Sequence, residues 1–126
     1  MAVAVADSGT TATLTQNTEI VLKTGYGTHS LGTATGRYTA AGVYVCVVNT
    51  TNMVAGNIIE LRCYLAVLAA GDEQLAYYAT YTNVQGQKIK LSVPIPADAT
   101  AGSIKFTIKQ TDTGTMKAYP WKVLTI

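Results

Sequence analysis

From residue 43 onward the chain repeatedly alternates its side chains with a period of two, in short segments separated by glycine, proline and asparagine. A period of two is the spacing of a β-strand, whose successive side chains point to opposite faces of the sheet. The segments fall at residues 43–48, 59–67, 75–81, 89–93, 104–109 and 119–126. With two short strands near residues 12–15 and 19–23, they predict an all-β, antiparallel β-sandwich or barrel of roughly seven to eight strands.

The segment at residues 43–48 is apolar on both of its faces. Its side chains are Val43, Val45 and Val47 on one face and Tyr44, Cys46 and Val48 on the other. We expect this strand in the middle of a sheet, since a strand with two apolar faces gains from burial on both sides. In the segment at residues 59–67, a slip of one residue would bury Glu60 and Arg62, so its register is strongly specified.

Residues 1–42 differ from residues 43–126 within a chain of 126 residues, which is the size of one domain. The first part is rich in threonine and glycine and shows little apolar periodicity. Its glycines at positions 25, 27, 32, 36 and 42 argue against regular structure, because glycine adopts positive φ angles that other residues avoid. We expect an extended N-terminal arm and a long Gly/Thr-rich loop, followed by a β-sandwich body. Such a long loop inside a compact domain is typical of a binding or contact element, with disorder as the alternative.

Turns and strand ends are predicted from glycine and proline. Gly71-Asp72 predicts a hairpin turn. Pro94 and Pro96 should end a strand and lead into a loop, because proline lacks the N–H that a central strand needs. Pro120 weakens the start of the last strand and favours an edge or a bulge.

Cys46 and Cys63 are the two cysteines of the chain. The apolar residues 1–6 lack the basic residues of a secretory signal and end at Asp7, so we expect the protein to be made and folded in a cytoplasm. Thiols stay reduced there, and both cysteines are expected to be small buried side chains. A disulfide between neighbouring strands is the alternative.

The residues that catalysis and metal binding require are too few. His29 is the one histidine, whereas an ordinary zinc site needs three or four ligands, so we expect His29 to be a solvated loop residue. A set made of Ser30, His29 and Asp7 would lack rigid support. The seven acids show no paired-carboxylate motif. We therefore predict that the protein is not an enzyme and that it has no catalytic, cofactor-binding or metal-binding residues.

Charge is sparse and unevenly distributed. Charged residues make up 13% of the chain and the formal net charge is +2, which is too little to predict a nucleic-acid partner. Residues 84–126 hold six lysines, four of them on the outward phases of two expected strands: Lys88, Lys90, Lys105 and Lys109. If those strands share a sheet, the lysines form a basic face. That face would protect a sheet edge, or dock an acidic protein surface or phosphates.

Tyrosine is concentrated on two neighbouring expected strands, with Tyr64 on one and Tyr77, Tyr78 and Tyr81 on the next. A tyrosine-lined face can fill a subunit interface or stack sugars or bases. Cross-strand packing within the domain is the alternative. The chain also has no stretch of about 18 apolar residues, so we expect no membrane partner.

Several segments resemble small β-rich proteins encoded among the structural genes of tailed bacteriophages. They are residues 41–45, 59–62, 75–81, 93–96, 106–111 and 119–124. The resemblance covers about the last two thirds of the chain and includes no active-site motif. It implies a virion component, such as a head decoration (cement) protein or a small tail or head-fibre subunit.

The function expected from this resemblance is a capsid decoration protein that stabilises the shell by bridging capsid subunits. Its partners would be the major capsid protein or other virion proteins, with a homo-oligomer (a trimer among the options), and its location the virion, assembled in the host cytoplasm. The alternative is a host-surface or glycan adhesin on a tail or fibre, with Tyr78 and Trp121 lining a shallow sugar site. Contacts are expected from residues 3–15 and 25–42. Candidate interface residues are Val3, Val5, Leu14, Tyr26, Tyr38, Tyr64, Tyr77, Tyr78, Tyr81 and Trp121.

Overall fold

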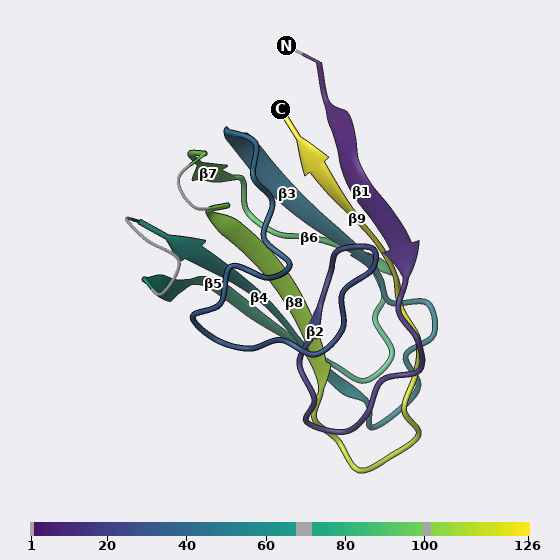
Figure 1. Cartoon of the computed structure of the whole chain (residues 1–126). Coiled ribbons are helices and arrows are strands. Elements are labelled where there is room, and N and C mark those ends of the chain that lie inside the picture. Colours follow the sequence, from purple (N-terminus) through teal and green to yellow (C-terminus); the bar gives the residue numbers. More distant parts are fainter. Residues whose placement is uncertain (1, 68–71, 100–101) are drawn as a thin grey trace.

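The computed structural model describes residues 2–67, 72–99 and 102–126, in which two antiparallel sheets pack together as a β-sandwich (Figure 1). The described residues form nine strands, slightly more than the sequence predicts, and no helix. No helix able to cross a membrane therefore occurs in this part of the chain. The predicted turn at Gly71-Asp72 includes Gly71, which lies outside the described residues.

The first sheet, sheet A, has the order β1-β9-β3-β6, and β7 also pairs with β3. Its strands are β1 (Ala4–Thr10), β3 (Gly42–Asn49), β6 (Ile89–Leu91), β7 (Ile95–Ala97) and β9 (Pro120–Thr125). The second sheet, sheet B, has the order β2-β8-β4-β5. Its strands are β2 (Ile20–Val21), β4 (Ile58–Ala66), β5 (Glu73–Thr82) and β8 (Ile104–Gln110).

The core lies between the sheets and takes one face of each. β3 supplies Tyr44, Cys46 and Val48 from sheet A, and it lies in the middle of that sheet as predicted. Ile104, Phe106 and Ile108 of β8 face them from sheet B, together with Ile59, Leu61 and Cys63 of β4. Both cysteines are buried, and this burial raises the pKa of each thiol.

Two predictions about strands and loops are wrong. Residues 12–15 form no strand, whereas most of the expected N-terminal arm is strand β1, which pairs with β9 along its length. The segment around Pro96 is strand β7 rather than only a loop. Pro96 is tolerated because β7 lies at the outer side of β3, where a missing N–H interrupts no inner ladder.

A β-bulge in β5 changes which side chains share a face. Tyr77 lies opposite Cys63, but Leu75 lies opposite Tyr64, so Ala76 is the extra residue. Tyr77 consequently points toward the core, while Leu75 points to the outer face of sheet B. Simple alternation had placed both on one face.

Residues 22–41 form the expected long loop, named here the covering loop, and it lies over the outer face of sheet B (Figure 1). The loop leaves β2 and returns to the sheet where Tyr38 pairs with Ile104 of β8. Gly36 allows this close return. Its φ is 83°, and a Cβ there would lie 2.6 Å from the Val21 side chain.

Candidate functional site

The outer face of sheet A is built largely from apolar side chains, with polar ones at Ser8, Thr10, Asn49 and Lys122. The strand registers place Val45 beside Leu124, and Leu124 in turn beside Val5 on β1. On the other side of β3, Val47 lies beside Leu91 of β6. We name this set the apolar face of sheet A: Val5, Val43, Val45, Val47, Ile89, Leu91, Pro96, Leu124 and Ile126.

The sides of this apolar face are open to solvent, whereas Val45 and Val47 in its middle are each only 8% exposed. Val5 and Leu91 are each 57% exposed, and Ile89 and Ile126 are 50% and 41% exposed. Antiparallel sheets with one face in the core usually present polar side chains on the other. Exposed apolar side chains gathered on one surface mark an interaction site more often than scattered ones do.

A shallow depression of about 270 Å³ lies on this face at the junction of β3, β6 and β9. It is lined by Val47, Ile89 and Pro120, with Asn49 and Lys122 as polar members. Lys122 lies directly beside Val47 in the sheet and is exposed. The surface is therefore apolar with one cation near its centre, and it fits a partner that offers apolar side chains around an acidic or carbonyl group.

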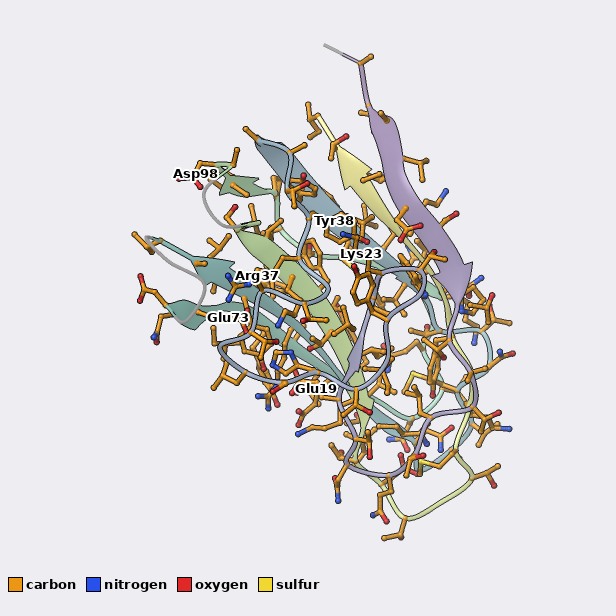
Figure 2. All side chains as sticks on the ribbon, viewed as in Figure 1. Glu19, Lys23, Arg37, Tyr38, Glu73 and Asp98 are labelled. Carbon is orange, nitrogen blue, oxygen red and sulfur yellow. The ribbon has the colours of Figure 1, made fainter. Side chains whose placement is uncertain are left out.

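The outer face of sheet B has the opposite chemistry, because charged side chains lie on it beneath the covering loop. Glu73 of β5 is fully buried and accepts hydrogen bonds from Arg37 Nε (2.8 Å) and from the Gly32 backbone N–H (3.2 Å). Lys105 of β8 also donates to Glu73 Oε1 at 3.2 Å. Figure 2 shows Arg37 of the loop and Glu73 side by side. These contacts fasten the loop to the sheet.

A second layer of this network surrounds His29. Its ring stacks on Tyr64 with the centroids 4.6 Å apart, and Lys105 Nζ lies 3.3 Å from His29 Nδ1. Tyr64 and Thr107 both donate hydrogen bonds to Glu19. His29 Nε2 lies 3.9 Å from a carboxylate oxygen of Glu19 and of Glu73.

Burial lowers the pKa of both bases in this network. Desolvation is the largest cause for the His29 imidazole and for the Lys105 ammonium. A lowered pKa in a cleft can indicate catalysis, but Glu73 and Lys105 are fully covered by the chain itself. Their hydrogen bonds go to the loop and to each other, so the network positions the loop.

The candidate interface residues fall into three groups. Val3, Val5, Tyr26 and Tyr78 are exposed. Tyr77 and Tyr81 are half-buried and pack against the core. The remaining four are buried, covered by the other side of the sandwich or by the loop, and are not exposed for a contact as the sequence led us to expect: Leu14, Tyr38, Tyr64 and Trp121.

Three further expectations are corrected. His29 is not a solvated loop residue, because its side chain is only 5% exposed under the loop. The basic face does not exist, since Lys90 belongs to sheet A and Lys105 is buried in sheet B. The tyrosines form no single face, because the bulge in β5 places Tyr77 on the opposite side from Tyr64.

Trp121 and Tyr78 also lie on different sheets, so they do not line one sugar site. Trp121 instead borders a groove of about 350 Å³ between β1 and the start of the covering loop. Tyr26, Ser8, Thr10 and Thr24 are among the other residues that line this groove.

No family model, curated protein or solved structure matches this chain. Within the described ranges, no group of three or more His, Cys, Asp or Glu side chains is arranged to hold a metal ion. The apolar face of sheet A could have been found from the sequence, because residues 43–48 are apolar on both sides. That pattern predicted only a central strand, although it also fits a strand whose second face serves a partner.

Proposed function

We propose that the chain is a structural protein of a phage virion, and that it decorates the capsid by docking the apolar face of sheet A onto capsid subunits. The observation that carries this proposal is the face itself, with Val5, Ile89 and Leu91 half or more exposed at its two sides. The resemblance of the later segments to virion proteins of tailed phages supplies the partner.

Docking would stabilise a shell without any chemical step. Each apolar square ångström removed from water contributes roughly 25 cal/mol, and a copy that spans two capsid subunits removes area on both. A protein that binds the assembled shell and not its dissociated subunits stabilises the shell by mass action. The exposed leucine and isoleucine of β6 would enter apolar pockets, and Lys122 would meet an acidic or carbonyl group of the capsid.

The test is the thermal stability of particles of the cognate phage, with and without this protein. We expect saturating protein to raise the temperature at which the shell opens. Leu91→Glu should abolish this increase, because it places a charge on an exposed apolar position of the docked surface, which docking would remove from water. Leu31→Glu is the matched control, since Leu31 is also an exposed leucine but lies on the covering loop. Equal shell melting with and without the wild-type protein would refute the proposal.

A second candidate function is a glycan adhesin on a tail or fibre. The groove beside β1 favours it, because Tyr26, which is 43% exposed, lines it together with several serine and threonine residues, and the buried Trp121 forms part of its wall. Under this proposal, Tyr26→Ala removes binding on a glycan array, whereas Tyr78→Ala on the far sheet does not. An array without signal for the wild-type protein would reject it.

A further inference from the structure

The sandwich has four sheet edges, and three of them carry features that block strand pairing. β1 has a bulge between Val5 and Asp7, and beyond it only residues 7–10 pair in regular register, with the Asp7 carboxylate accepting hydrogen bonds from Thr24 of the covering loop. β2 is two residues long and is bridged by Thr28 of the chain's own loop. β6 and β7 have three residues each, with Lys90 in one and Pro96 in the other. Bulges, charges, prolines and short length are the usual protection of edge strands.

Among the described strands, β5 is the edge with the longest segment free of such protection, because its own bulge at Ala76 leaves residues 77–82 in regular register. It is ten residues long, and after Glu73 it contains neither a charged residue nor a proline. Its side chains from Gln74 to Thr82 are exposed or half-buried. An edge of this length leaves a row of backbone N–H and C=O groups facing away from β4 without a strand partner.

We propose that β5 pairs in antiparallel orientation with β5 of a second copy of this chain, which joins two four-stranded sheets into one of eight strands. A neutral strand can pair with itself because no like charges come together. Because the edges at β1, β2 and β6/β7 are blocked in a second copy as well, β5 is the edge of that copy that remains free to pair. The pairing is therefore isologous and closes at two copies, whereas pairing of β5 with a different edge would build an open fibre.

The bulge at Ala76 limits the register. Opposite residues of an antiparallel pair share a face, so regular pairing is available to residues 77–82. Centred on Ala79, this register places Tyr77 opposite Tyr81 of the second copy on the inner face. On the outer face, Tyr78 lies opposite Thr80 of the second copy. Aromatic pairs and tyrosine–threonine pairs across strands both stabilise a sheet.

This inference concerns the free protein and does not depend on the proposed function. The test is sedimentation equilibrium of the full chain from low micromolar to about millimolar concentration. We expect a dimer that dissociates on dilution. The double variant Thr80→Lys/Thr82→Lys should weaken the dimer at least tenfold, because it brings four lysines to one seam. Thr113→Lys/Thr115→Lys adds the same charge on an exposed turn of the chain and should leave the dimer intact.

A cross-link tests the register. Ala79→Cys should form an intermolecular disulfide under mild oxidation, because the two positions face each other across the twofold axis, whereas Thr113→Cys should not. A wild-type protein that stays monomeric throughout, or a dimer unaffected by the lysines at positions 80 and 82, would overturn the proposal. Hydrogen exchange of the β5 amides gives a further check. If these amides become protected only when capsid protein is added, the edge pairs with a strand of another protein, and the proposal is overturned. None of these results bears on shell melting, so the two proposals fail independently.

Discussion

The outer faces of the two sheets have opposite chemistry and opposite coverage. Sheet B carries charges on its outer face, among them Glu73 and Lys105, and the chain covers them with its own loop. Sheet A carries apolar side chains on its outer face and leaves many of them exposed. A charged face could have been left in water at little cost, and an apolar face gains most from being covered. Under the proposed function, the cover of sheet A comes from another molecule.

The largest expected effect tests the covered face. Glu73→Gln should lower the free energy of unfolding by about 3–5 kcal/mol, because Arg37 and Lys105 then remain buried beside a neutral amide. Denaturant unfolding measures it. Glu60→Gln is the matched control, since the Glu60 carboxylate pairs with Arg62 on the same face but is partly exposed, and its loss should cost less than about 1 kcal/mol. Equal effects would show that the covered network does not hold the loop.

The next effect concerns the return of the covering loop. Gly36→Ala should destabilise the protein more than Gly25→Ala, although both glycines have positive φ angles close to 85°. Backbone strain costs each variant roughly 1–2 kcal/mol, but only at Gly36 does the new methyl group also meet Val21. Thermal unfolding of the two variants compares them directly. A Gly25→Ala variant that is the less stable of the two would contradict the close approach.

Titration of His29 gives a third test. Its pKa is lowered in the folded state by burial, so the unfolded chain binds the extra proton more readily below about pH 6.5. Stability should therefore fall as the pH drops through this range, by at most about 1.4 kcal/mol per pH unit. The groups facing the ring are Glu19, Glu73, Lys105 and Arg62. Because His29 is the one histidine, His29→Gln should flatten the profile between pH 5.5 and 7.5. A profile that the variant leaves unchanged would place the titration elsewhere.

The smallest effect is expected on the apolar face of sheet A. Leu91→Ser and Ile89→Ser should each change the free energy of unfolding by no more than about 0.5 kcal/mol, because both side chains are already half exposed. The same variants should weaken binding to particles. A large loss of stability would show that these side chains belong to the fold rather than to a contact surface.

The strands of the body could be predicted from the sequence, because alternation is a local signal. The phase of β8 is an example: Ile104, Phe106 and Ile108 face the core, and Lys105 points away from it. That Lys105 is nevertheless buried could not be predicted. Its cover comes from the covering loop, which is more than 70 positions away in the chain, and no local pattern relates the two.

The candidate site was only partly predictable for a similar reason. The sequence placed apolar side chains on both faces of residues 43–48, but the partner strands of that segment depend on topology. Only the registers of β1 against β9, and of β9 and β6 against β3, show that Val5, Leu91 and Leu124 extend the same surface. The bulge at Ala76 likewise depends on pairing with β4. Alternation along the sequence therefore could not predict that Tyr77 and Leu75 point to opposite faces of the sheet.

The most direct test is an image reconstruction of the phage particle at a resolution that shows side chains. Docking through sheet A predicts that Leu91 and Val5 lie against the capsid, while the covering loop and sheet B face away from the shell. A copy bound with the apolar face of sheet A exposed to solvent, or a particle that lacks the protein altogether, would contradict the account.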